Sequence, residues 1–154
     1  MSDIVNVHNI AAYLDPLPSI APNTTTAPTA TQQLGRTVNR LTATGGASYR
    51  SAAHVLTIKA VLAAKKKVTI ARAVQTGSDT ASFAAYGDAI TSTVIGSTSA
   101  TAAQTINQCI SDAIDLGNAK QYIRFNVTPT PSATSTDTIA IAGTWVLGGA
   151  DKNS

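Results

Sequence analysis

The stretch of residues 54–76 constrains the fold of this chain more than any other feature. Apolar residues recur at every second position on both sides of a short central segment, which is the period of a β-strand with one buried face. The alternating positions are Leu56, Ile58, Ala60 and Leu62 in the first run, and Val68, Ile70, Arg72 and Val74 in the second. Because residues 63–67 between the runs are few, we expect an antiparallel hairpin with this segment as its loop.

The composition indicates a single β-rich domain with an uncharged surface. The chain of 154 residues is long enough for one domain with an arm or tail, and its apolar share of 44% is enough for a core. Charged residues make up only 12%, which is about half the usual share, so Ser, Thr and Ala must cover much of the surface. A surface of this kind suits contact with other proteins.

The basic residues do not indicate a nucleic-acid site. The net charge is only +3, and the one cluster, three lysines at residues 65–67, falls in the predicted loop, where a solvated turn is the simpler interpretation. The aromatic residues do not alternate with Lys and Arg as a base-stacking surface requires. The N-terminus lacks the pattern of a secretory leader, and no apolar run is long enough for a membrane span. We therefore expect a soluble protein that binds neither nucleic acid nor membrane.

No group of residues suited to catalysis or metal binding stands out. His8, His54 and the single Cys109 lack the close spacing of zinc ligands. The spacing of Asp112 and Asp115 does not by itself bring two carboxylates together for general acid–base chemistry. No Ser-His-Asp set or phosphate-binding loop is visible. We expect no enzyme activity, no cofactor and no metal, and a buried, inert thiol at Cys109.

The first third of the chain differs in composition from the rest. Pro16 and Pro18 interrupt any regular element, and residues 19–34 are rich in Thr, Ala and Pro without periodicity. Such a segment cannot bury enough apolar surface to order itself. We predict an extended N-terminal arm at residues 1–47 that can hold a short strand, a β-sandwich body at 48–150 and a tail at 151–154.

Further strands are expected along the body. A turn at residues 77–79 and a loop at 81–88 precede a weak strand at 89–97, and clean alternation predicts strands at 121–128 and 138–147. Gly143 marks a bulge or a close backbone approach in the last strand. In residues 105–116 the apolar positions fit a helical period and also permit a strand, and the period alone favours a helix.

Short strands between regularly spaced turns predict an all-β fold, either a β-sandwich or a jelly roll, with the extended N-terminal arm. Alternation assigns one face of each strand to the core. The predicted inward-facing residues are Leu56, Ile58, Leu62, Ile70, Ile123, Phe125, Val127, Ile139, Ile141 and Leu147.

Three fragments of the second half, AKQYIRFNVTP, STDTIAIAG and VLGGAD, resemble a known group of proteins. The group comprises the small head decoration, cement or minor capsid proteins of tailed bacteriophages, and the resemblance covers residues 48 to 151. It implies a strand rather than a helix at residues 110–116. It also implies a protein made in the host cytoplasm that binds the major capsid protein on the outer surface of the virion and associates with itself as a trimer.

The resemblance suggests a role for the N-terminal arm as a strap. We predict that residues 1–34 are ordered only by packing on a neighbouring subunit or on the capsid. The candidate contact residues are Ile4, Val5, Val7, Ile10, Tyr13, Leu14, Leu17 and Ile20. The alternative is that residues 4–10 form the first strand of the chain's own sheet.

Two other functions compete with capsid decoration. The first is a head-fibre or tail subunit that binds a host surface glycan through residues 81–88, with Phe83 and Tyr86 as contacts. Counting copies per virion separates this function from decoration, because a decoration protein covers the head in many copies. The second is an enzyme such as a glycan hydrolase module, for which no acid pair or nucleophile set is evident.

Overall fold

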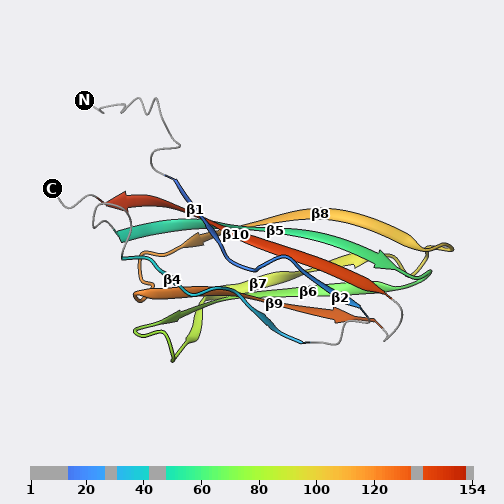
Figure 1. The fold of residues 1–154 in the computed structure, drawn as a ribbon, viewed down its shortest axis with the longest axis horizontal. Coiled ribbons are helices and arrows are strands. Elements are labelled where there is room, and N and C mark those ends of the chain that lie inside the picture. The colour runs from blue at the N-terminus through green and yellow to red at the C-terminus, as the bar shows by residue number, and fades with distance from the viewer. Residues whose placement is uncertain (1–13, 27–30, 42–47, 133–136, 152–154) are drawn as a thin grey trace, which may run out of the picture.

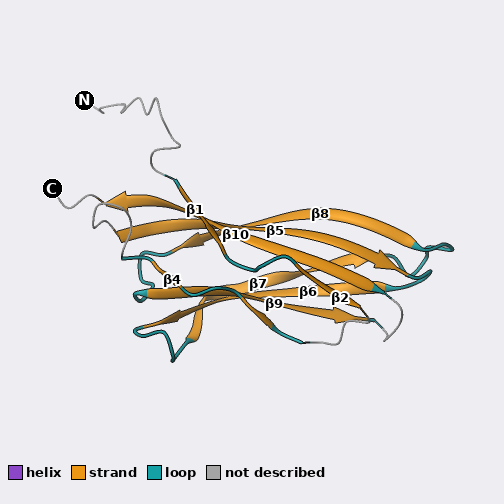
Figure 2. Cartoon of the chain, viewed as in Figure 1, coloured by secondary structure: helices purple, strands orange, loops and turns teal. Residues whose placement is uncertain are grey.

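Two antiparallel β-sheets packed face to face make up the fold (Figure 2). The computed structural model describes residues 14–26, 31–41, 48–132 and 137–151. These described residues form strands, turns and loops and include no helix. The predicted all-β sandwich is therefore confirmed.

Each sheet has short strands at one edge and long strands across the rest (Figure 1). In the first, sheet A, β1 (Asp15–Pro18) and β2 (Asn23–Thr26) both pair with β10 (Thr138–Asp151), followed by β5 (Ser48–Leu62) and β8 (Gln104–Asp115). In the second, sheet B, β3 (Gln33–Leu34) and β4 (Val38–Asn39) both pair with β9 (Tyr122–Pro131), followed by β6 (Lys67–Gly77) and β7 (Ala84–Gly96).

The chain is wound as a double ribbon, because its first half pairs antiparallel with its second half. Successive pairs alternate between the sheets. β1 and β2 pair with β10 in sheet A, β3 and β4 with β9 in sheet B, β5 with β8 in sheet A, and β6 with β7 in sheet B. The ribbon reverses direction between β6 and β7.

Residues 54–76 form two strands, but the predicted hairpin between them is wrong. β5 pairs with β10 and β8, whereas β6 pairs with β9 and β7, so the two strands lie in different sheets. The connecting segment crosses from sheet A to sheet B, with Lys65 at a φ of 60° and a 3.2 Å hydrogen bond from Lys66 N to Ala63 O. Alternation identifies which face of a strand is buried but not which strand lies beside it. Here the two buried faces meet across the core.

The core between the sheets contains all ten residues predicted to face inward, each no more than 1% exposed. His54 stacks on Phe125 with ring centroids 3.6 Å apart, and Trp145 packs edge-on against both rings. Gly143 lies against the His54 ring, because a Cβ at this position would be 2.9 Å from His54 Cε1. The close backbone approach predicted at Gly143 is therefore confirmed.

The ambiguous segment forms β8, so the helix favoured by its period is wrong and the strand implied by the resemblance is right. β8 pairs with β5 without a break from Gln104 opposite Leu62 to Asp115 opposite Ser51. Apolar residues four positions apart share a face in a strand as well as in a helix, because four is a multiple of two. Cys109 lies on the outward face and is exposed, so the expected buried thiol is also wrong.

The described part of the N-terminal arm belongs to the chain's own sheets. β1 and β2 extend sheet A beside β10, and β3 and β4 extend sheet B beside β9. The prediction that residues 1–34 are ordered only by a neighbouring subunit or the capsid is therefore wrong for residues 14–26 and 31–34. Backbone pairing with two sheets supplies the order that the apolar content of this segment alone could not. The alternative first strand at residues 4–10 lies outside the described residues.

Candidate functional site

The sandwich has two long sides along which its sheets end, and the two sides differ. We call the side formed by β1, β2, β3 and β4 the covered seam, and the side formed by β7 and β8 the open seam (Figure 1). The difference between the seams locates the candidate site.

At the covered seam, the N-terminal segment passes from one sheet to the other and is held by backbone hydrogen bonds. Ser19 N and Ile20 N both donate to Gly143 O, at 2.9 and 3.1 Å, and Gly143 N donates to Ile20 O at 3.0 Å. Arg36 N donates to Ser19 O at 2.7 Å, and Gly35 N donates to Phe125 O at 2.7 Å. The chain thereby ties together the two sheet edges that it covers.

At the open seam, no described strand covers the space between β7 and β8. The side chains of Ile106, Ile110 and Ile114 on β8 and Ile90 on β7 pack against the core but are only partly buried. Inward-facing residues near the sheet centre, such as Ile141, are 1% exposed. Apolar surface therefore remains partly exposed to solvent along this side.

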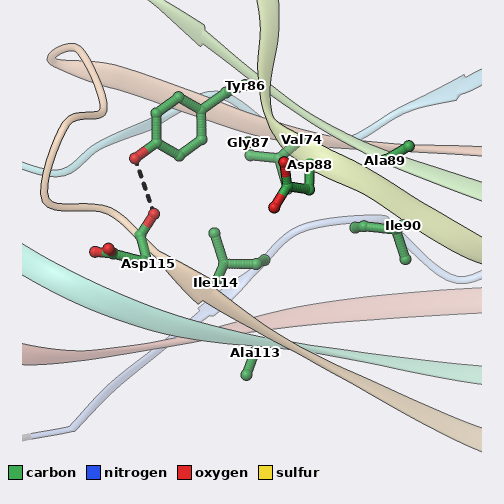
Figure 3. A pocket seen from close by; sticks show the side chains of 9 residues that line it. All are labelled: Val74, Tyr86, Gly87, Asp88, Ala89, Ile90, Ala113, Ile114 and Asp115. Atoms are coloured by element: carbon green, nitrogen blue, oxygen red, sulfur yellow. Dashed lines mark hydrogen bonds between the residues drawn. The ribbon is translucent and has the colours of Figure 1, made fainter.

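One end of the open seam widens into a cleft of about 420 Å³ (Figure 3). It is lined by Val74 of β6, residues 86–90 of β7 and residues 113–115 of β8. Figure 3 shows the Ile114 side chain and the Asp88 carboxylate pointing into the cleft, whereas the Ala113 methyl group points away from it. Apolar side chains and a carboxylate therefore both face the cleft.

A register shift in β7 lies at the cleft. Arg72 pairs with Ile90 and Val74 with Tyr86, so β7 advances four residues while β6 advances two, which leaves two extra residues in β7. A separate shift between Ile70 and Arg72 adds one more extra residue. Gly87 lies in the two-residue shift with a φ of 72°, a conformation that glycine adopts at little cost. A Cβ at Gly87 would meet no atom within 4 Å, so its backbone conformation rather than crowding favours glycine there.

Polar groups line the cleft beside its apolar side chains. The Tyr86 hydroxyl donates to the backbone oxygen of Asp115 at 2.9 Å and so joins β7 to the end of β8. The Asp115 carboxylate accepts a hydrogen bond from Gly117 N at 2.8 Å, which fixes the turn after β8. The described residues include no group of three or more His, Cys, Asp or Glu side chains that could hold a metal ion.

An ion pair behind the cleft joins the two sheets. Arg72 Nε lies 2.9 Å from Asp112 Oδ2, and the two side chains are 5% and 12% exposed. Arg72 also donates to Thr93 Oγ1 at 2.6 Å and to Thr91 O at 2.8 Å, so it ties β6 to both β7 and β8. Burial and, secondarily, the charge of Arg72 lower the pKa of His54 from 6.5 to about 3. The buried His54 ring is therefore neutral at physiological pH.

Of the predicted contact residues, the structure describes Leu14, Leu17 and Ile20, and these three do not share one exposed patch. Ile20 is 5% exposed and belongs to the chain's own core, and Leu17 packs against that core, so neither is available as a strap contact. Leu14 is 42% exposed. The remaining predicted contacts, Ile4, Val5, Val7, Ile10 and Tyr13, lie outside the described residues.

The predicted loop at residues 81–88 is partly strand, because β7 begins at Ala84. The two aromatic residues predicted to contact a glycan are both engaged within the chain. The guanidinium carbon of Arg124 lies 4.1 Å from the Phe83 ring centroid, and Tyr86 is hydrogen-bonded to β8. Sequence reasoning missed the open seam and its ion pair, although Arg72 among the apolar alternating positions of β6 was a signal for a buried charge.

Comparison with protein-family models and with curated proteins finds no match for this chain. Within the described ranges, no helix is long and apolar enough to cross a membrane. Any assignment of function therefore rests on the geometry of the chain and on its sequence.

Proposed function

We propose that the chain is a structural virion protein that decorates and stabilises a bacteriophage capsid by binding the major capsid protein. The observation that carries this proposal is the outward face of sheet A, which is broad and almost without charge. The resemblance of the fragments around β9 and β10 to phage head decoration proteins supports the same function.

The outward face of sheet A is built from the alternate residues of three long strands. Lys59 is the only charged residue among those along its middle, and the others are uncharged. They are Val55, Thr57 and Val61 of β5, Asn107, Cys109 and Ser111 of β8, and Ala140, Ala142, Thr144 and Val146 of β10. A flat surface with little charge to desolvate suits close contact with another protein, because buried unpaired charges oppose binding.

The winding of the chain also supports a virion role. If β1 with β2 and β3 with β4 each count as one interrupted strand, four antiparallel pairs alternate between two four-stranded sheets. We propose that this arrangement is a jelly roll, a double-sheet fold that occurs in viral capsid proteins. A rigid sandwich of this kind can present a fixed face to a lattice.

Stabilisation in this proposal comes from bridging neighbouring capsid subunits. Each decorating protein contributes a modest contact through the face of sheet A, and linked contacts on one shell reinforce one another. Association of the protein as a trimer at the local threefold positions, which the resemblance implies, would multiply that effect. No reaction takes place, so the function depends on shape and surface chemistry.

The proposal is tested by placing a charge on the proposed contact face. Thr57→Arg puts a guanidinium in the middle of the outward face of sheet A, and Ala73→Arg puts the same group at an exposed position of β6 in sheet B. Heads lacking the protein are mixed with each variant, and binding is measured by co-sedimentation. We expect Thr57→Arg to reduce binding and Ala73→Arg to leave it unchanged.

The second readout is the resistance of the heads to heat, followed by release of packaged DNA. Heads carrying the unmodified protein should release DNA at a higher temperature than bare heads, and heads treated with Thr57→Arg should resemble bare heads. Equal release temperatures with and without the unmodified protein would overturn the proposal.

A further inference from the structure

Three of the four sheet edges formed by the described strands carry features that prevent pairing with another chain. β1 and the segment after it contain Pro16, Pro18 and Pro22, and proline cannot donate a backbone hydrogen bond. β3 and β4 are only two residues long each. β7 is interrupted by two register shifts, and the second of them contains Gly87. These are the devices by which proteins keep sheet edges from joining.

β8 forms the fourth edge and lacks these features. Its 12 residues pair with β5 in unbroken register, and they include no proline, lysine or arginine. Its outward residues, from Thr105 to Ala113 in steps of two, are exposed and uncharged. The inward-pointing charge of Asp112 is paired with Arg72 and so does not repel an incoming strand. β8 therefore offers a long edge of unbroken register for backbone pairing.

We propose that residues 1–13 of a second copy of this chain pair as a strand with the free edge of β8. Side chains of the added strand would then cover Ile106, Ile110 and Ile114 along the open seam. This inference names the self-contact within the oligomer of the proposed function.

Residues 1–13 have the length and composition to pair along the edge of β8. Thirteen extended residues reach about 43 Å at about 3.3 Å per residue, and the 12 residues of β8 span about 40 Å. The segment contains Ile4, Val5, Val7 and Ile10, and β-branched residues favour strands. Either face of such a strand would present two of these side chains to the seam.

The position of β1 favours a second copy over the same chain. β1 lies at the covered seam, separated from the free edge of β8 by β10 and β5. Reaching that edge within one molecule means crossing about four strand spacings, or about 19 Å. Less than two-thirds of the segment's reach would remain to follow β8. A neighbouring copy lying alongside can place the whole segment along the edge.

The native cysteine provides a test with purified full-length protein and no heads. Cys109 is exposed in the middle of β8, and no other cysteine is present. Single cysteines are introduced at each of residues 4 to 9, and disulfide formation is followed on non-reducing gels. Thr80→Cys, in an exposed loop, is the control for random collision. We expect covalent dimers at alternate positions of the segment, since every second residue of a paired strand faces the side on which Cys109 lies.

A second pair of variants tests the edge itself. Asn107→Lys with Ser111→Lys places two charges on the outward row of β8, and Ser92→Lys places one on β7. The β8 variant should lose the dimers while keeping its melting temperature, and the β7 variant should keep them.

Dimers no more abundant than those of Thr80→Cys, dimers without alternation, or a disulfide within one chain would overturn the inference. So would dimers that survive the β8 lysines. Because heads are absent from this experiment, its failure would leave the contact with the capsid untouched, and failure of head binding would leave the pairing along β8 standing.

Discussion

The covered seam and the open seam differ in how far they shield the apolar interior of the sandwich from solvent. At the covered seam the chain's own N-terminal segment fills the side of the sandwich, and Ile20 reaches 5% exposure there. At the open seam the inward residues of β8 remain partly exposed, and the edge of β8 has none of the usual protection. This difference between the edges supports our proposal that another chain pairs along β8.

The open seam nevertheless keeps a fixed geometry. Arg72 joins β6 to β7 and β8 through one ion pair and two hydrogen bonds, and Tyr86 joins β7 to the end of β8. These contacts hold the edges of the two sheets in place without covering the apolar side chains between them. The open seam is therefore preorganised for the strand that we propose to add there, and preorganisation lowers the entropy lost on binding.

The largest expected effect comes from matched isoleucine truncations in one sheet. Ile141→Ala removes a side chain that is 1% exposed, and we expect it to lower the free energy of unfolding by about 2 to 5 kcal/mol. Ile110→Ala removes a partly buried side chain at the open seam. It should cost about half as much or less, because folding buries less apolar area of Ile110 than of Ile141. Chemical denaturation of both variants measures the difference. Equal costs would mean that the two regions are equally packed.

Acid should destabilise the protein through His54. Its pKa is about 3 in the folded chain and 6.5 in the unfolded chain, so between these values the unfolded chain binds more protons. The free energy of unfolding should therefore fall as pH is lowered from 6.5 toward 3, by up to about 1.4 kcal/mol per pH unit. Backbone hydrogen bonds from Ser82 and Ala81 lower the pKa of Asp79, whose contribution is lost only below its ordinary value of 3.8.

Denaturation curves at several pH values test the role of His54. The variant His54→Asn has no titrating ring, so its stability should change little between pH 6.5 and 4.5. If the free energy of unfolding of the variant falls with pH as steeply as that of the unmodified protein, the acid effect comes from other groups.

Two glycine variants compare the seams at smaller magnitude. Gly143→Ala would place a Cβ 2.9 Å from the His54 ring and 3.3 Å from Ile20 Cβ, and we expect a loss of about 1 to 3 kcal/mol from overpacking. Gly87→Ala meets no neighbouring atom, so only its positive φ opposes the change, at a cost of about 1 to 2 kcal/mol. Thermal denaturation should rank Gly143→Ala as the more damaging. The reverse order would indicate that His54 and Ile20 shift at little cost to accommodate the added methyl group.

The smallest expected effect concerns the hydrogen bond at the cleft. Tyr86→Phe removes the donor to Asp115 O and should lower stability by about 0.5 to 1.5 kcal/mol. The same change should speed amide exchange at the end of β8 while leaving β1 unaffected. Exchange that rises equally at both seams would show that the contact is not local to the open seam.

The sequence predicted the core because alternation reports directly on burial. All ten residues predicted to face inward lie between the sheets, and the close approach at Gly143 was visible from its place on the apolar face of β10. Alternation carries no information about which strands are neighbours. The sequence therefore predicted that β5 and β6 pair with each other, whereas they lie in opposite sheets. The helix favoured for residues 105–116 failed because Ile106, Ile110 and Ile114 satisfy both periods.

The candidate site was harder to predict because it depends on long-range pairing. The low apolar content of residues 19–34 suggested an arm held by other molecules, whereas the backbone groups of β2 and β3 pair with β10 and β9. The open seam becomes visible only when β7 and β8 are placed at the sheet edges. The pairing of β7 with β6 shifts register twice, and Gly87, which lies in the second shift, was the one local signal.

The central claim is that the open seam, and not the covered seam, receives another chain. Hydrogen exchange of individual amides, compared between dilute protein and protein assembled on heads, tests it most directly. We predict that assembly slows alternate amides along β8, which are the ones that do not already bond to β5, and leaves β1 and β2 unchanged. Unchanged exchange along β8, with slowing confined to β1 and β2, would contradict the account.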